Sequence, residues 1–179
     1  ITINNTAKNA KGLVAYNSGV VTNNGIIINN SERVKPIGSN DAGAVGIAVL
    51  GTGSQGTNSS SGNLLLQNSS TNLSAGAYNE GVFVNAGEIE VRGDKGIGVY
   101  SKGATTNTTL SNKITVSGDN SIALFSDGAV STNFKIGSLT LNVNGDDAYA
   151  FYAKNGGGYN VTGNTTVNVG AGSIGFQYV

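Results

Sequence analysis

Three stretches of the chain align without a gap: IEVRGDKGIGVYSKG (89–103), ITVSGDNSIALFSDG (114–128) and LNVNGDDAYAFYAKN (141–155). Each begins with alternating apolar and polar residues, passes through Gly-Asp, and enters a second apolar segment. Self-similarity at a fixed spacing is the sequence signature of a repeat fold. The repeat therefore has to be followed along the whole chain before any other feature is interpreted.

The same unit recurs on both sides of these stretches. AYNSGVVTNNGIII (15–28) and AYNEGVFVNAGEIE (77–90) share one frame, and VNVGAGSIGFQYV (167–179) repeats the later frame with one deletion. The last strongly apolar residue of each first strand is Ile3, Ile28, Leu66, Val91, Val116, Val143 and Val169. The steps between these anchors are 25, 38, 25, 25, 27 and 26 residues, so we predict about seven units of about 25 residues. The long second step predicts a loop insertion at residues 31–43.

Each unit contains short segments with the period of two that is typical of β-strands. Residues 89–91 form one such segment, residues 97–100 a second, and residues 108–110 a weaker third. Frequent Gly and Asn suit corners, because both residues tolerate left-handed backbone. Three short strands per coil, stacked on like strands, predict an all-β parallel β-helix in which residues 1–179 form one segment.

Alternation also predicts which side chains face the interior. We expect one inward wall to contain Ile97, Val99, Ile122, Leu124, Tyr149, Phe151, Ile174 and Phe176. A second wall is expected to contain Val91, Val116 and Val143. The chain starts and stops within predicted strands and shows no capping segment, so we expect the natural protein to continue into further coils.

Composition excludes several classes of function. The chain has no Cys and no His, which removes thiol chemistry, imidazole triads and the usual zinc sites. Ten basic and ten acidic residues give no net field to attract nucleic acid or an anionic membrane. The apolar runs are far shorter than the roughly 20 residues of a membrane-spanning helix. We therefore expect no cofactor, no metal, no nucleic-acid partner and no membrane insertion of this segment.

Repeating charged residues form two columns. Asp94, Asp119 and Asp146 hold one place, where a corner role with local backbone hydrogen bonds competes with a weak cation site. Asp146 and Asp147 are the only adjacent acidic pair, which is poor evidence for glycoside hydrolysis. A second column alternates in sign through Lys102, Asp127 and Lys154, as expected of an exposed ladder of weak ion pairs.

An aromatic column is the most informative feature. We place in it Tyr16, Tyr78, Tyr100, Phe125 and Tyr152, with Leu50 and Gln177 in the remaining units. The residues two positions earlier are Val14, Ala48, Gly76, Gly98, Ala123, Ala150 and Gly175. If both columns face outward, small residues form a shelf beside the rings that suits a sugar ring or a partner protein. Tyr78, Tyr100, Phe125 and Tyr152 are the predicted partner-binding residues; alternatively the rings stack on one another or the inserted loop covers them.

The units at 85–103, 22–28, 114–128 and 141–155 resemble the passenger domains of Gram-negative autotransporters, especially large repetitive adhesins. That resemblance implies a right-handed β-helical stalk, exported through the outer membrane by a C-terminal barrel and displayed at the bacterial surface or secreted. It implies no catalytic motif.

Three hypotheses for function follow. The leading one is a non-enzymatic adhesin segment that binds a host-cell surface protein or glycan, or a partner bacterium. The second is a polysaccharide-active β-helix, either a lyase or a hydrolase. The third is a structural spacer.

Overall fold

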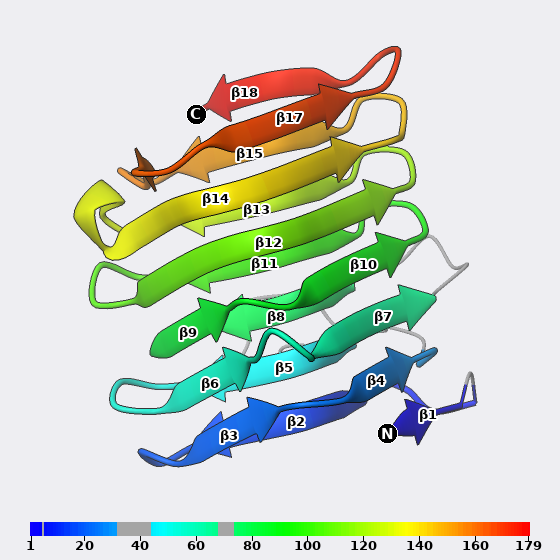
Figure 1. The fold of residues 1–179 in the computed structure, drawn as a ribbon, viewed down its shortest axis with the longest axis vertical. Coiled ribbons are helices and arrows are strands. Elements are labelled where there is room, and N and C mark those ends of the chain that lie inside the picture. Colours follow the sequence, from blue (N-terminus) through cyan, green and yellow to red (C-terminus); the bar gives the residue numbers. More distant parts are fainter. Residues whose placement is uncertain (5, 32–43, 68–73) are drawn as a thin grey trace.

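The computed structural model describes residues 1–4, 6–31, 44–67 and 74–179, and shows a right-handed parallel β-helix of about six turns. Two parallel sheets face each other, and the chain crosses from one to the other twice in every turn (Figure 1). The predicted loop at 31–43 lies, apart from Ser31, outside the described residues.

One strand of every turn lies in a seven-stranded sheet. Its strands are β2 (Lys11–Tyr16), β5 (Val45–Leu50), β8 (Ala75–Asn79), β11 (Ile97–Lys102), β13 (Ile122–Asp127), β15 (Tyr149–Lys154) and β18 (Ile174–Tyr178). The rest of each turn lies in an eleven-stranded sheet. One column of that sheet contains β3 (Val20–Asn23), β6 (Gln55–Asn58), β9 (Val82–Asn85) and β16 (Asn160–Val161). The other contains β1 (Thr2–Ile3), β4 (Ile26–Asn29), β7 (Asn63–Gln67), β10 (Glu88–Arg92) and β17 (Thr165–Val169). The long strands β12 (Asn107–Ser117) and β14 (Phe134–Val143) span both columns, and a 3-10 turn, Ser131–Asn133, precedes β14.

The parallel β-helix is confirmed, whereas the expected number of coils is slightly too high. β1 and β18 are single strands of incomplete turns at the two ends, so about six turns are complete rather than seven. Three strands per turn also holds only in part. In the fourth and fifth turns the second and third strands merge into β12 and β14, and their register shifts between Leu110 and Asn112.

The anchor in the first turn, Ile28, is displaced by one residue, whereas Ile3 lies in the predicted column. Ile3 pairs with Asn29, which pairs with Leu66, so the equivalent of Leu66 is Asn29 and not Ile28. A shift of one residue turns a side chain to the opposite face of a sheet. Accordingly Ile27 and Asn29 are buried, while Ile28 is only half-buried. The run IIIN (26–29) places apolar side chains on both faces of the strand. Its pattern therefore does not indicate which residue aligns with Leu66.

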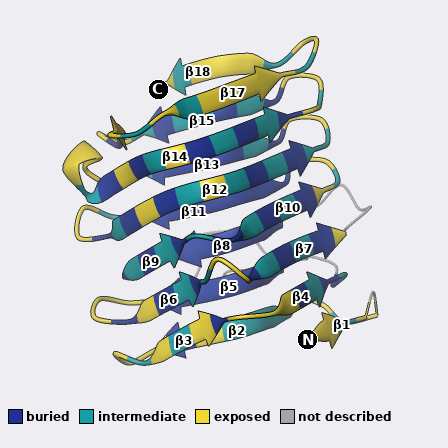
Figure 2. Cartoon of the chain, viewed as in Figure 1, coloured by how far each residue is buried: buried dark blue, intermediate teal, exposed yellow. Residues whose placement is uncertain are grey.

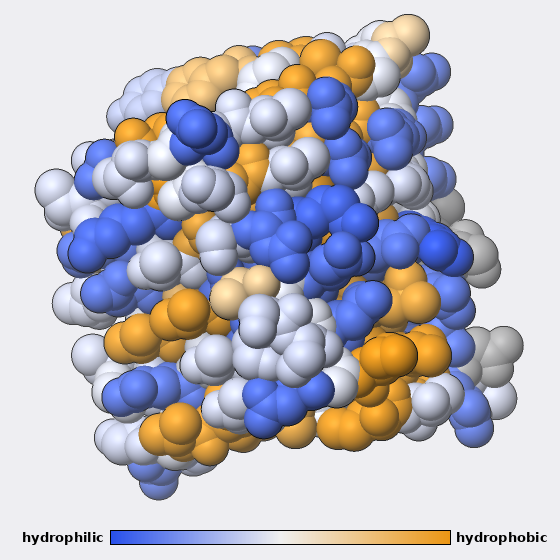
Figure 3. Space-filling model, viewed as in Figure 1, coloured by the Kyte–Doolittle hydropathy of each residue, from blue (hydrophilic) through white to orange (hydrophobic). Residues whose placement is uncertain are grey.

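Burial is greatest in the middle turns and falls toward both ends (Figure 2). Figure 3 shows strongly hydrophilic residues over the middle turns on the outer face of the eleven-stranded sheet. Glu88 contacts Lys113 at 3.0 Å and Glu90 contacts Arg92 at 2.7 Å, both as exposed or half-exposed pairs. Such pairs contribute less than about 1 kcal/mol each, so the interior has to supply most of the stability.

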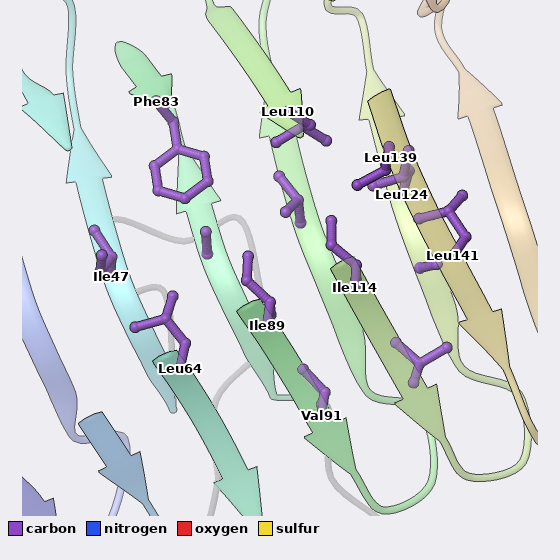
Figure 4. Packing of buried hydrophobic residues seen from close by; sticks show 14 of the residues in the cluster. Ile47, Leu64, Phe83, Ile89, Val91, Leu110, Ile114, Leu124, Leu139 and Leu141 are labelled. Carbon is purple, nitrogen blue, oxygen red and sulfur yellow. The ribbon is translucent and has the colours of Figure 1, made fainter. Parts of the chain in front are cut away.

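The main hydrophobic core lies between the two sheets, where labelled side chains such as Leu64, Ile89 and Ile114 point toward the seven-stranded sheet (Figure 4). Val91, Val116 and Val143 are fully buried in this core, as predicted. Val99 and Leu124 are also buried there, Phe151 is half-buried against it, and Phe176 is exposed at the end of the solenoid.

The prediction that Ile97, Ile122, Tyr149 and Ile174 face the interior is wrong. A Cβ added to Gly98 would lie 2.6 Å from Cγ2 of Ile114 in the opposite sheet, so Gly98 faces inward. Val99 is inward as well, and two successive inward residues break the alternation of β11. Ile97 therefore packs with Tyr100 in a second cluster, outside the main core. Ile122, Tyr149 and Ile174 share the register of Ile97.

A buried asparagine ladder closes one corner of the solenoid. The Asn23 amide nitrogen donates to Oδ1 of Asn58, and the Asn58 amide nitrogen donates to Oδ1 of Asn85, each at 2.8 Å. Asn85 also donates to the carbonyls of Gly87 and Ser111. Buried amides are stable only when paired in this way. The ladder aligns the turns at the junction of the two columns of the eleven-stranded sheet.

Candidate functional site

The candidate site is a continuous aromatic column on the outer side of the seven-stranded sheet, here called the aromatic wall. Tyr78, Tyr100, Phe125 and Tyr152 pair in register on four successive strands, as predicted. The Tyr78 and Tyr100 rings meet edge to face at 5.2 Å between centroids. Tyr100 and Phe125 stack at 4.4 Å and 6°, and Phe125 meets Tyr152 edge to face at 5.1 Å. Aromatic pairs with these geometries attract beyond their simple area burial.

Tyr16 and Leu50 do not belong to the wall. Tyr16 pairs with Leu50, but the residues in register with Tyr78 are Ala48 and, below it, Val14. In the seven-stranded sheet, strands β2 and β5 are therefore displaced by two residues from the predicted alignment. A shift of two residues keeps side chains on the same face, so alternation gives no warning of it.

The expectation of an exposed shelf beside the rings is wrong. Exposure is 0% for Tyr78, 4% for Tyr100 and 9% for Phe125, and only Tyr152 is half-buried. Gly98 faces the interior, so it forms no outer shelf next to Tyr100. The alternative of rings stacked on one another is confirmed. Whether the inserted loop covers them concerns residues outside the described part of the chain.

Each buried phenol meets a carboxylate. The Tyr78 hydroxyl donates to Oε1 of Glu80 at 2.6 Å, and the Tyr100 hydroxyl donates to Oδ2 of Asp127 at 2.7 Å. Burial, followed by the hydrogen bond and negative charge of Glu80, raises the pKa of Tyr78 far above its ordinary value. The Tyr78 phenol therefore stays protonated and donates to Glu80 at neutral pH.

Asp127 is the electrostatic centre of the wall. Its Oδ1 accepts a hydrogen bond from Asn155 at 2.6 Å, and Lys154 lies 3.3 Å from its Oδ2. Burial alone raises the Asp127 pKa, but the bonds from Tyr100 and Asn155 and the charge of Lys154 outweigh it and hold the pKa below its ordinary value. Lys154 also lies 5.1 Å from the Phe125 ring centroid. Asp127 and Lys154, two members of the predicted column of alternating charge, therefore form an ion pair.

The accessible part of the wall lies over the fifth and sixth turns. Tyr149 and Tyr152 are half-buried, with ring centroids 5.4 Å apart at 77°, and Ile122 is half-buried beside them. Sequence reasoning missed Tyr149 because simple alternation places it inside. The small residues Gly98, Ala123 and Ala150 share one column, and closely packed sheets require small inward residues. This column could have indicated that these three positions face inward and that Tyr149 faces outward.

The acidic column has the corner role. Oδ1 of Asp94 accepts the backbone N–H of Asp119, and Oδ1 of Asp119 accepts that of Asp146, each at 3.0 Å. Within the residues that the structure describes, no three His, Cys, Asp or Glu side chains gather closely enough to hold a metal ion. The same part of the chain contains no helix long and apolar enough to cross a bilayer.

No family model, curated protein or solved structure matches this chain. The resemblance to autotransporter passengers therefore stays a prediction. The candidate site is defined by its geometry: a rigid column of rings, buried at Tyr78 and Tyr100 and accessible at Tyr149 and Tyr152, with one ion pair at its edge.

Proposed function

We propose that this chain is a non-enzymatic adhesive segment of a protein displayed on, or secreted from, a bacterial cell, in the manner of an autotransporter passenger. Its partner is a host-cell surface protein or glycan, or a neighbouring bacterium. The observation that carries the proposal is the accessible end of the aromatic wall, where Tyr149 and Tyr152 lie on β15, the strand that also carries Lys154.

Three physical features support a recognition surface there. Tyrosine offers a large apolar face together with a polar hydroxyl, which makes it a frequent contact residue at interfaces. The Tyr152 ring is held by Phe125 and Tyr149, so binding loses little side-chain entropy. The Asp127–Lys154 pair adds a polar edge for hydrogen bonds to a glycan or a peptide.

The polysaccharide-active alternative has weaker support. Asp94 and Asp119 each accept a backbone N–H hydrogen bond at a corner. Asp127 accepts hydrogen bonds from Tyr100 and Asn155 and forms an ion pair with Lys154. These arrangements favour roles in folding over roles in acid–base chemistry. New reducing or unsaturated ends after digestion of polysaccharides would restore the enzyme hypothesis.

The test is binding of the folded chain to epithelial cells and to bacteria, compared with the double variant Tyr149→Ser/Tyr152→Ser. Tyr16→Ser is the matched control, because Tyr16 is 65% exposed on the same sheet but outside the wall. We expect the double variant to lose at least about tenfold in affinity and the control to bind normally. Equal binding by all three proteins would refute the wall as the adhesive site, and no binding by any of them would favour the spacer.

A further inference from the structure

Tyrosine is the most easily oxidised kind of side chain in these 179 residues. The sequence contains seven Tyr and no Cys, Met, Trp or His. Thiols and thioethers, which take up oxidants in most proteins, are therefore missing. A one-electron oxidant that attacks this chain reacts first at tyrosine.

Four of the tyrosines belong to one continuous column of touching rings. The ring centroids of Tyr149 and Tyr152 lie 5.4 Å apart. Phe125 lies between Tyr152, at 5.1 Å, and Tyr100, at 4.4 Å, and Tyr78 follows Tyr100 at 5.2 Å. Rings at these separations are in van der Waals contact. Electron tunnelling falls off steeply with distance, so contacts this close allow an electron to pass along the column.

The two ends of the column differ in access. Tyr149 and Tyr152 are half-buried, so a molecule in solution can reach them. Tyr100 is 4% exposed and Tyr78 is 0% exposed. A bulky oxidant can therefore touch the first pair of rings and not the second. An electron that leaves the buried pair has to pass through the rings between them and the solvent.

Each buried phenol has a proton acceptor already in place. The Tyr100 hydroxyl donates to Oδ2 of Asp127 at 2.7 Å, and the Tyr78 hydroxyl donates to Oε1 of Glu80 at 2.6 Å. A phenol that has lost an electron is a strong acid, so its proton crosses the existing hydrogen bond to the carboxylate. The products are a neutral tyrosyl radical and a neutral carboxylic acid. No cation is left in the buried part of the wall, where an unpaired charge would be costly.

We infer that the aromatic wall is a relay that carries an oxidising equivalent from its accessible tyrosines to the buried Tyr100 and Tyr78. The co-reactant is a one-electron oxidant of phenols, such as a high-valent metal complex. In the first step this oxidant takes one electron from Tyr152 and is itself reduced, and the phenol proton of Tyr152 passes to water. This inference does not depend on the proposed adhesive function.

The later steps move the radical inward without any net loss of electrons. One electron passes from Tyr100 through the intervening ring to the Tyr152 radical, which takes up a proton from water and becomes a phenol again. At the same time the Tyr100 proton passes to Asp127. A second exchange of the same kind moves the radical to Tyr78 and its proton to Glu80, and Tyr100 recovers its proton from Asp127.

The test is rapid freeze-quench electron paramagnetic resonance after the folded chain is mixed with tris(bipyridine)ruthenium(III), which is too bulky to touch a buried ring. We expect a tyrosyl radical that lives at least about tenfold longer than that of a free tyrosine amide, because a buried ring cannot couple with a second radical. Tyr78→Phe/Tyr100→Phe should lose this long-lived radical. Tyr16→Phe, which removes an exposed phenol outside the wall, should keep it. An undiminished long-lived radical in the double variant would overturn the inference.

Two further variants separate a relay from direct oxidation of the buried rings. Phe125→Leu removes the bridging ring, and Tyr149→Phe/Tyr152→Phe removes the accessible phenols. Both leave the buried phenols and their carboxylates in place. We expect the long-lived radical to form at least about tenfold more slowly in each variant. An unchanged rate of formation would contradict the relay, and unchanged circular dichroism confirms that the variants remain folded.

Discussion

The Tyr100 hydroxyl donates a 2.7 Å hydrogen bond to Oδ2 of Asp127. Asp127 lies on the adjacent strand β13, two residues beyond Phe125, the residue that pairs with Tyr100. This bond ties an outward-facing ring to the charge ladder at the edge of the same sheet. It makes the aromatic wall and the Asp127–Lys154 pair one structural unit. The wall is therefore expected to respond to pH and to substitution as a unit.

Asp127→Asn should make the protein less sensitive to acid. The folded-state pKa of Asp127 is depressed, so its carboxylate adds stability above its ordinary pKa and loses that contribution as pH falls through the folded-state value. We expect the free energy of unfolding to fall less between about pH 6 and about pH 3 in the variant than in the wild type. Urea unfolding at several pH values measures this, and identical pH profiles would contradict it.

Tyr100→Phe should destabilise the fold by about 1.5 kcal/mol at neutral pH, because it removes a hydrogen bond to a charged group and leaves the ring in place. The control is Tyr152→Phe, whose hydroxyl lies on the half-buried ring at the accessible end. That variant should change the free energy of unfolding by less than about 0.5 kcal/mol. Equal losses for the two variants would rule out a special role for the Tyr100–Asp127 bond.

Asn58→Ala should destabilise the protein by about 2 to 4 kcal/mol, since it removes the buried hydrogen bond that Asn23 donates to Asn58 and the one that Asn58 donates to Oδ1 of Asn85. Asn24→Ala, at an exposed position beside the ladder, should cost less than about 0.5 kcal/mol. Thermal or urea unfolding of both variants provides the comparison. A small effect at Asn58 would mean that water replaces the lost amide.

Gly98→Ala should cost about 1 to 3 kcal/mol, because a Cβ there meets the Ala123 carbonyl at 2.5 Å and Cγ2 of Ile114 at 2.6 Å. Gly175→Ala is the matched control, in the same column at the end of the solenoid, where a Cβ meets nothing within 4 Å. We expect the control to unfold at the wild-type urea concentration. Tolerance of Gly98→Ala would mean that the two sheets can move apart at this turn.

Tyr78→Ser and Tyr16→Ser test the corrected register of the wall. Tyr78 is fully buried, packs on Tyr100 and is hydrogen-bonded to Glu80, so its loss should cost about 3 to 5 kcal/mol. Tyr16 is exposed and outside the wall, and its loss should cost less than about 0.5 kcal/mol. Similar losses would indicate that Tyr16 shares the environment of Tyr78 after all.

Much of the fold was predictable from the repeat, because stacked turns require like residues in like places. The gapless alignment of 89–103, 114–128 and 141–155 predicted the parallel register of turns three to six and the column that joins Tyr100, Phe125 and Tyr152. It also aligned Asp94 with Asp119 and Asp146, and of the two roles considered for that column the structure shows the corner role. Ile28 was misaligned because IIIN is apolar on both faces, and Tyr16 and Leu50 were misaligned because a shift of two residues leaves the alternation intact.

The sequence by itself determined that the chain forms a solenoid, which residues stack in the later turns, and where the Gly-Asp corners lie. Only the tertiary structure decided which side of the seven-stranded sheet each residue occupies and how much of the aromatic wall is accessible. The physical reason is the close approach of the two sheets. Gly98 and Val99 both turn inward to fill the narrow space opposite Ile114, and this moves Ile97 and Tyr149 to the outer face. A contact between residues on opposite sheets does not change the alternation of apolar and polar residues along either strand, so it cannot be predicted from that alternation.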